Sequence, residues 1–217
     1  MVLEFLFNPL LSLSPALAVL IFSGIILVII NVFYKVLINQ NAAKAIKDRQ
    51  KEISKKLQAE RKAGNTDKMN ALMKESLQEN SKLMRMTLKP MIVSFIIVII
   101  FLPWLHSVYG DGFGQISDSK GTVKLNGVDY SFSIDNNGIT VDNAAAYKGP
   151  CDAQCVAVNG NAYEITREGD KVKFGPIVAS LPFALPLLGY TAGWLGWYIL
   201  VSIPLVIIIR KLMKIYV

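Results

Sequence analysis

The sequence predicts an α-helical membrane protein with three transmembrane helices, a cytoplasmic antiparallel coiled-coil hairpin and a small extracytoplasmic all-β domain. Three observations support this prediction: three apolar runs, a basic segment of helical period between the first two, and a segment of alternating period before the third. The 217-residue chain is 53% hydrophobic with a mean hydropathy of +0.41, which is too apolar for an ordinary soluble domain. Burial of all three runs in a soluble core is the weaker alternative.

The first apolar run, from Leu17 to Ile38, is nearly free of charge and long enough, at about 1.5 Å per residue, to cross a membrane. The residues before it, Met1 to Ser14, contain no Lys or Arg, and their only charge is Glu4. A signal peptide would need a basic start and a small-residue cleavage site. We therefore expect an uncleaved outer segment and first transmembrane helix over residues 1–38.

The charge distribution predicts the orientation of the chain. Fourteen basic and six acidic side chains lie between Lys35 and Lys89, whereas six basic and nine acidic ones lie between the second and third runs. Arg210, Lys211 and Lys214 follow the third run. Because basic residues near a membrane stay on its cytoplasmic side, we expect a multi-pass protein of the plasma membrane with its N-terminus outside and its C-terminus in the cytoplasm.

The basic segment at residues 39–89 has the period of two helices. Ile46, Ile53 and Leu57 recur at spacings of seven and four, and a break follows at residues 64–66. The second arm repeats the pattern at Met69, Met73, Leu77, Met84 and Leu88. This predicts an antiparallel coiled-coil hairpin with a thin apolar seam and a tip that frays. Its surplus of Lys and Arg indicates a solvated basic face, or a surface for ribosomal RNA or anionic lipid.

Methionine is frequent on the second arm of the hairpin, at Met69, Met73, Met84 and Met86. Packing within the hairpin would explain these residues, since methionine fills gaps and favours helices. The alternative is a substrate-contact surface, because flexible thioether side chains adapt to varied apolar partners.

Polar residues inside the apolar runs are the candidate groove residues, since an unpaired polar group in hydrocarbon is costly. Asn31 requires either an interhelical hydrogen bond or a hydrated groove open to the cytoplasm. Lys35, one turn further on, either extends to the lipid headgroups or joins that groove. The candidates for the opposite wall are Ser94, in a second helix expected at residues 90–106, and Ser202 in the third.

Residues 107–176 change to a period of two and predict the β-domain. Strands alternate around the turn Asn126-Gly127, and the pattern recurs 33 positions later around Asn159-Gly160. Two three-stranded meanders imply a small sandwich or open barrel of about six strands, interpreted as a passive or partner-binding domain. The only histidine of the sequence, His106, lies outside the predicted β-domain. The sequence predicts no enzymatic activity, no metal site and no cofactor.

Cys151 and Cys155 bracket a short loop of this outer segment. A local disulfide is the favoured interpretation, because a zinc site would need about four ligands and no second pair of cysteines exists. Residues 177–192 are apolar but broken by prolines, and we expect an interfacial segment that lies at the membrane surface or dips into it. Residues 193–217 form the expected third transmembrane helix, kinked at Pro204, and a basic cytoplasmic tail.

The chain resembles the YidC/Oxa-type membrane insertase superfamily, and in particular its archaeal three-span YidC-like branch. The resemblance rests on the order of the elements and on three stretches that cover about half of the chain: NVFYKVLINQNAAKAIKDRQKEISKKLQ, KLMRMTLKPMIVSFIIVIIFLPWL and GWLGWYILVSIPLVIIIRKLMK. The outer β-domain lies outside this resemblance. Bacterial members carry an arginine within the first span, which this chain lacks.

The resemblance implies a membrane protein insertase or chaperone that works without nucleotide. Nascent membrane proteins and the lipid bilayer would be its partners, and the ribosome and further membrane subunits are additional partners that it suggests. Asn31 and Lys35 fall where superfamily members have polar or basic groove residues. The alternative from the residues alone is a structural tether or sensor with a ligand-binding outer domain. A transporter is less favoured, because three spans with few buried charges would need to oligomerise.

Overall fold

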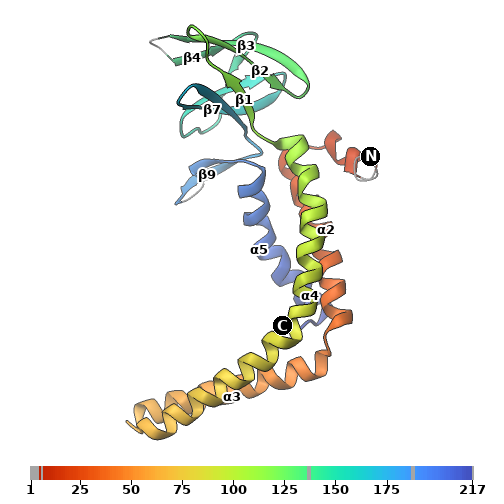
Figure 1. Cartoon of the computed structure of the whole chain (residues 1–217), viewed down its shortest axis with the longest axis vertical. Coiled ribbons are helices and arrows are strands. Elements are labelled where there is room, and N and C mark those ends of the chain that lie inside the picture. The colour runs from red at the N-terminus through yellow and green to blue at the C-terminus, as the bar shows by residue number, and fades with distance from the viewer. Residues whose placement is uncertain (1–4, 6, 136–137, 187–188, 217) are drawn as a thin grey trace. The chain divides into compact units, whose positions relative to one another are not determined.

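The computed structural model describes residues 5, 7–135, 138–186 and 189–216 (Figure 1). The chain forms two compact units, which are described separately. The first contains residues up to Ser23 together with Phe101–Ile203. The second contains Gly24–Ile100 and the residues from Pro204 onward.

Among the residues described, three helices are long and apolar enough to cross a membrane, as the sequence predicted. They are α2 (Pro15–Leu37), α4 (Thr66–Tyr109) and α5 (Trp194–Met213), of 23, 44 and 20 residues. Helix α2 begins two residues before the predicted run and ends one residue before its end. Helix α5 contains Pro204 and continues four residues beyond the apolar run that predicted it.

Helix α4 is continuous where the sequence suggested a boundary. The predicted hairpin ended at Lys89 and the predicted second transmembrane helix began at Pro90, but the structure has one helix through both Pro90 and Pro103. A proline removes its own backbone donor, and its ring crowds the carbonyl group of residue i−4, which can bend a helix without ending it. The basic arm and the apolar span are therefore two parts of a single helix.

The first basic arm is helix α3, Gln40–Lys62, and its start is set by Asn39. The Asn39 side chain accepts hydrogen bonds from the backbone N–H groups of Asn41 and Ala42, both at 3.1 Å. The helix ends before Gly64, whose φ of 68° suits glycine, and α4 begins at Thr66. A break is therefore present at residues 63–65, one residue earlier than the predicted 64–66.

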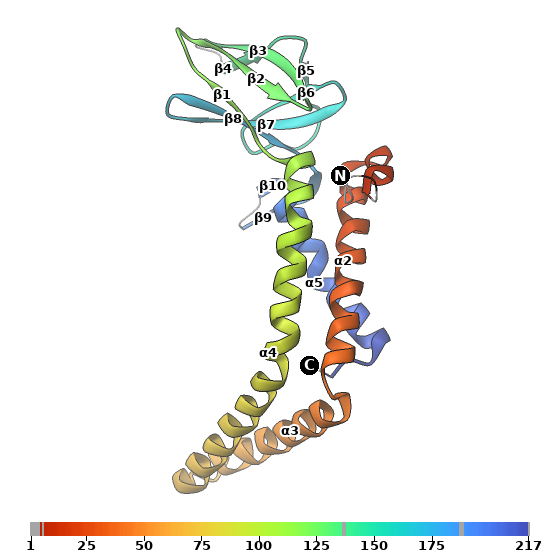
Figure 2. The same cartoon turned by 45° about the vertical axis from the view of Figure 1, so that its right-hand side comes forward.

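The two arms lie side by side and run in opposite directions (Figure 2). Arg49 Nε donates to Glu75 Oε1 at 3.0 Å, and Gln50 Nε2 donates to Asn80 Oδ1 at 2.6 Å. Near the turn, Lys68 Nζ lies 3.9 Å from a carboxylate oxygen of Glu60. These polar contacts between the arms are solvent-exposed and individually weak.

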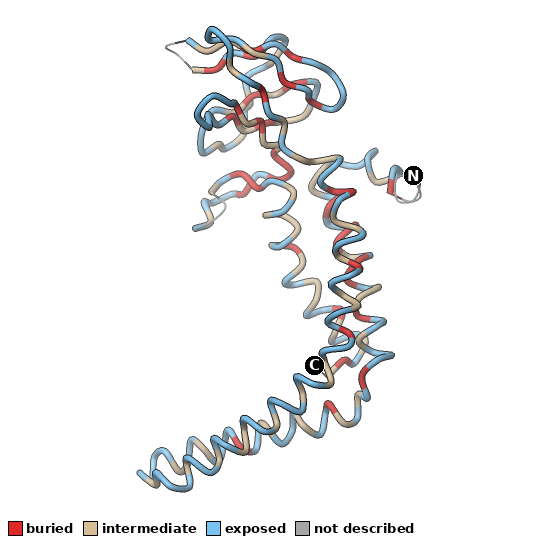
Figure 3. The backbone as a smooth tube through the Cα atoms, in the orientation of Figure 1, coloured by how far each residue is buried: buried red, intermediate tan, exposed pale blue. Residues whose placement is uncertain are grey.

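The face of α4 that turns toward α3 differs from the predicted seam. Less exposed positions on both arms recur at spacings of three and four, and few residues of the arms are fully buried (Figure 3). On α3 they are Ala43, Ile46, Gln50, Ile53, Leu57 and Glu60; on α4 they are Met69, Leu72, Ser76, Glu79, Leu83, Met86 and Pro90. Met73, Leu77, Met84 and Leu88, which the periodicity assigned to the seam, are exposed. Two apolar stripes share this helix, and apolar spacing alone selected the outward-facing one.

The residues between α4 and α5, 110–193, are named the outer region after the sequence prediction, and their described part contains ten strands in three antiparallel sheets. The predicted meanders are present as β2-β3-β4 and as β6-β7-β8, and the latter belongs to a five-stranded sheet in the order β1-β8-β7-β6-β5. Two further strands, β9 and β10, form a separate pair. The bounds are β1 Gly112–Gln115, β2 Lys120–Leu125, β3 Val128–Asp135, β4 Gly138–Val141, β5 Ala145–Ala146, β6 Gln154–Val158, β7 Asn161–Glu168, β8 Lys171–Pro176, β9 Ala179–Leu185 and β10 Gly189–Ala192.

The 33-residue repeat appears as two similar hairpins that are joined by hydrogen bonds. The turns Asn126-Gly127 and Asn159-Gly160 have positive φ at both residues, as a type I′ turn requires. Asn126 Nδ2 donates to the Tyr163 hydroxyl at 3.0 Å, and Asn159 Nδ2 donates to the Tyr130 hydroxyl. Each turn therefore binds the tyrosine of the other repeat, around a core that includes Phe132 and Phe174.

Two strands of the expected interfacial segment, Ala179–Leu185 and Gly189–Ala192, form an antiparallel pair, called the β9–β10 hairpin below. Strands β9 and β10 pair with Ala179 opposite Ala192 and Ser180 opposite Thr191. The prolines that suggested an irregular segment are compatible with a strand edge, where no backbone donor is needed. Adjacent strand pairing, which the local sequence does not reveal, makes this segment regular.

Candidate functional site

The second unit contains an apolar groove of about 540 Å³ between parts of α2, α4 and α5. Its walls are mostly aliphatic and aromatic, with polar groups from Asn31, Ser94 and Arg210. The lining residues are Leu27, Ile30, Asn31, Tyr34, Met91, Ile92, Ser94, Phe95, Ile96, Val98, Val206 and Arg210. A cavity of this size accommodates several side chains of a peptide segment.

Asn31 is completely buried and links two helices. Its Nδ2 donates to the Leu27 carbonyl oxygen at 2.8 Å, and its Oδ1 accepts a hydrogen bond from Arg210 Nε at 3.3 Å. The Arg210 guanidinium carbon also lies 5.3 Å from the centre of the Tyr34 ring. Asn31 thus has the interhelical hydrogen bond that was one of its two expected environments, and it also lines a groove whose walls are mostly apolar.

Sequence reasoning missed Arg210 as a groove residue and counted it with the basic tail. The apolar run ends at Ile209, but α5 continues to Met213, so Arg210 lies within the helix. It follows Val206 by one helical turn, and both side chains line the groove. The four-residue spacing between Val206 and Arg210, which places both side chains on one helix face, is the signal in the sequence that could have identified Arg210. The charge absent from the first span is therefore supplied by the third helix.

The other three predicted groove residues have different positions. Ser94 lines the groove, and its hydroxyl donates to the Met91 carbonyl oxygen at 2.7 Å. Lys35 is exposed and does not line the groove. Ser202 belongs to the first unit and is also absent from the lining. Of the four predicted residues, only Asn31 and Ser94 meet in the groove.

The methionines of the second arm divide between the two faces of α4. Met69 and Met86 lie on the less exposed face toward α3, whereas Met73 and Met84 are 53% and 68% exposed. The exposed stripe continues along the same helix into the groove. Its members are Met73, Leu77, Met84, Leu88, Met91, Ile92 and Phe95. One uninterrupted helix therefore carries apolar side chains from the hairpin to the groove.

The junction between α2 and α3 is bound to the chain's C-terminal segment through Gln40. Gln40 Nε2 donates to the carbonyl oxygens of Tyr34 and Ile38 at 3.2 and 3.3 Å, and its Oε1 accepts from the Tyr216 backbone N–H at 3.0 Å. The Lys44 ammonium lies 5.5 Å from the centre of the Tyr216 ring. These contacts fix the base of the hairpin beside the groove.

The helical part of the first unit has an aromatic cluster. Phe7, just before the 3₁₀ helix η1 (Asn8–Ser12), is buried, and its ring centre lies 4.9 Å from that of Phe22 and 5.1 Å from that of Trp104. Phe22 and Trp104 are stacked at 5.2 Å. Trp197 Nε1 donates to the Ala16 carbonyl oxygen at 2.9 Å. These contacts pack the N-terminal segment against α2 and α4.

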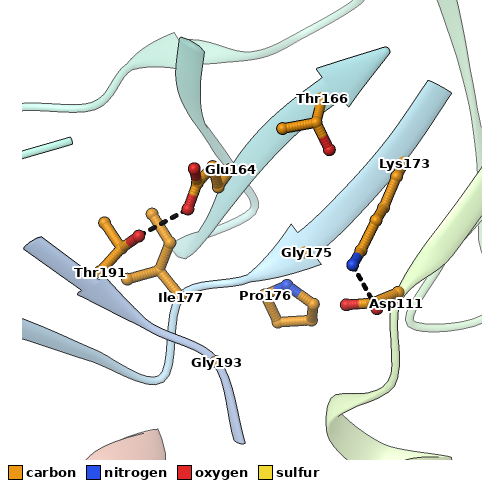
Figure 4. A pocket seen from close by; sticks show the side chains of 9 residues that line it. All are labelled: Asp111, Glu164, Thr166, Lys173, Gly175, Pro176, Ile177, Thr191 and Gly193. Carbon is orange, nitrogen blue, oxygen red and sulfur yellow. Dashed lines mark hydrogen bonds and ion pairs between the residues drawn. The ribbon is translucent and has the colours of Figure 1, made fainter. Parts of the chain in front are cut away.

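A polar pocket of about 230 Å³ lies in the outer region (Figure 4). Its charged groups are paired, since Lys173 Nζ lies 3.1 Å from Asp111 and the Thr191 hydroxyl donates to Glu164. No group of three or more His, Cys, Asp or Glu residues that could hold a metal occurs among the residues that the structure describes. Cys151 and Cys155 are joined by a disulfide.

The comparison with protein families gives one match, to the family described as integral membrane protein EMC3/TMCO1-like, over residues 4–125. No curated protein and no solved structure matches the chain. The matched range covers more than half of the chain and includes α2, α3 and the whole of α4. The chain therefore belongs to the EMC3/TMCO1-like integral membrane family, part of the Oxa1/YidC/Alb3/EMC3 insertase superfamily.

Proposed function

We propose that this protein is an archaeal YidC-like membrane protein insertase that receives nascent membrane proteins and transfers their apolar segments to lipid. The observation that carries the proposal is the hydrogen bond between the buried Asn31 and the half-buried Arg210 inside an otherwise apolar groove. Polar groups at such depth cost free energy unless they serve a partner or a polar cavity. Family membership supports the same function class.

In the proposed mechanism, the coiled-coil hairpin lies in the cytoplasm and the N-terminus lies outside. The exposed stripe of α4 makes the first contact with an apolar substrate segment, because Met73 and Met84 are flexible and exposed. The segment then moves along α4 into the groove. There the polar flank of the substrate interacts with Asn31 and Arg210, which lowers the cost of taking it into the bilayer.

No covalent step and no nucleotide is required, since the driving force is the transfer of an apolar segment into lipid. The basic surface of the hairpin is suited to ribosomal RNA, and ribosome contact would bring the substrate close to Met73. Further membrane subunits are additional partners in this proposal. The cell membrane is the proposed location.

Site-specific photo-crosslinking during translation tests the proposed path. Crosslinkers at Asn31, Met73 and Met84 should capture nascent membrane proteins. Met69 and Met86 are matched controls, since they are methionines of the same arm that face α3. Equal capture at all five positions, or capture at none, would contradict the path. Insertion of short-tailed substrates into liposomes containing the purified protein then tests the activity itself.

A second candidate function is a tether or sensor whose outer region binds a ligand. The polar pocket containing Glu164 and Lys173 favours this alternative. Replacing residues 121–174 by a short Gly/Ser linker separates the two proposals, because the groove residues lie outside that range. An insertase retains liposome insertion after the replacement, whereas a sensor loses its response.

A further inference from the structure

The β9–β10 hairpin leads directly into helix α5. Only Gly193 separates the end of β10 at Ala192 from the start of α5 at Trp194. The sequence contains no Asp, Glu, Lys or Arg from Ile177 to Ile209. The hairpin and the apolar helix are thus one uncharged stretch.

Strand β9 is buried at alternate positions in its first half and exposes the consecutive apolar residues Pro182, Phe183 and Ala184 in its second half. Ala179 and Leu181 are buried, whereas Phe183 is 63% exposed and Tyr190 on β10 is 39% exposed. In water, an exposed phenylalanine costs about 25 cal/mol for each Å² of apolar surface left uncovered. Contact with an apolar environment would therefore remove this cost for Phe183.

Two contacts attach the hairpin to the rest of the outer region. The Asp152 carboxylate accepts hydrogen bonds from the backbone N–H groups of Tyr190 and Thr191, the latter at 3.2 Å. The Thr191 hydroxyl donates to Glu164 of strand β7. Gly189 has a φ of 66°, and a Cβ at this position would overlap the Asp152 carboxylate. Asp152 lies within the loop closed by the disulfide, so this loop is hydrogen-bonded to the β9–β10 hairpin.

We infer that the β9–β10 hairpin is a membrane-surface anchor that embeds Phe183 in the lipid interface and is held to the outer region by Asp152. Three register pairs join the strands, and the shift in register between Gly189 and Thr191 leaves other backbone groups to water or lipid headgroups. The polar–apolar boundary supplies such partners, whereas the hydrocarbon core does not. Trp194, Trp197 and Tyr198 follow at once, and such residues favour the same boundary. Pro182 on β9 disfavours addition of a further strand, so lipid is the chosen partner rather than a protein strand.

The inference requires that α5 cross the membrane, but it is independent of insertase activity. The full chain with Phe183→Cys, labelled with an environment-sensitive fluorophore, tests it in liposomes of phosphatidylcholine and phosphatidylglycerol. The native cysteines stay in their disulfide and are not labelled. Lipids with a nitroxide near the headgroup should quench the probe at position 183 about threefold or more strongly than a probe at the control Thr140→Cys, because only the hairpin enters the interface.

Thr140 is an exposed polar residue on β4, in the three-stranded sheet β2-β3-β4. Equal quenching at positions 140 and 183 would overturn the anchor. Asp152→Ala tests the attachment separately, through hydrogen exchange of the intact protein in the same liposomes. The amides of Tyr190 and Thr191 should exchange at least about tenfold faster in this variant, since each loses its acceptor. Unchanged exchange would refute the role of Asp152 and leave the lipid contact to be decided by quenching.

Discussion

Replacing Arg210 by Gln should selectively impair the insertion of substrates with an acidic flank. Glutamine removes the positive charge but retains a donor for Asn31 Oδ1, so the buried amide keeps a partner. A substrate carboxylate in the groove would lie about 6 Å from the guanidinium, and at an effective dielectric constant of about 20 their attraction is about 3 kcal/mol. Since about 1.4 kcal/mol corresponds to a factor of ten, insertion should fall by about 10- to 100-fold after screening.

The assay compares two substrates in liposomes that contain equal amounts of folded protein. Both have the same apolar segment, and one has an aspartate in the translocated flank where the other has asparagine. The neutral substrate should change by less than about threefold in R210Q, because it has no charge to attract. Arg210→Lys should retain most of the insertion of the acidic substrate.

Lys211→Gln is the matched control for this prediction. It removes the same charge from the neighbouring position of α5, but Lys211 is exposed and does not line the groove. If K211Q and R210Q impaired the acidic substrate equally, the charge would act through the positive-inside rule rather than through the groove. Unaltered insertion of the acidic substrate by R210Q would refute the electrostatic role altogether.

Further predictions concern the stability of the folded chain and the junction between helices α2 and α3. Burial raises the pKa of the Tyr163 hydroxyl in the folded state. The stability that the neutral hydroxyl contributes is complete below about pH 10, the unfolded value, and is lost as the pH rises through the higher folded-state pKa. Unfolding measured at alkaline pH should show this loss of stability, and the loss should be smaller in Tyr163→Phe. Tyr163→Phe also loses the hydrogen bond that Asn126 donates to the Tyr163 hydroxyl. Its free energy of unfolding, measured by chemical denaturation, should therefore be about 1 kcal/mol lower than that of the native chain. Phe7→Ala should cost about 3 kcal/mol, since three aromatic contacts are lost, and thermal unfolding in detergent measures this change. Gln40→Ala should increase the spread of distances between spin labels on α2 and α3, whereas a spread equal to that of the native chain would show that the bond to Tyr216 does not fix this junction.

The sequence predicted those features that depend on local composition. Hydropathy located the three membrane-crossing helices, and the Asn-Gly turns located both meanders. The break between the arms followed from Gly64, because its backbone conformation suits glycine. These signals are local, and neighbouring elements do not override them.

Features that depend on distant neighbours were not predicted. Arg210 joined the groove because α5 continues beyond its apolar run and approaches Asn31, 179 positions away in the chain. The face of α4 toward α3 could not be chosen by apolar spacing, since Ser76 and Glu79 lie on that face while Leu77 is exposed. The β9–β10 hairpin depends on pairing with Ala192 and on the Asp152 contacts, neither of which the prolines of this segment suggest.

The reciprocal bonds between Asn126 and Tyr163 and between Asn159 and Tyr130 have a consequence for the origin of the outer region. In both contacts the asparagine of one repeat binds the tyrosine of the other repeat. The interface of a symmetric dimer has the same arrangement, since residue i of each subunit contacts residue j of its partner. Fusion of two copies of a short hairpin-forming peptide into one chain would make that intermolecular contact intramolecular. Each repeat, expressed alone, would then lack the partner side chains for its own turn and tyrosine, and its folding would require a second copy.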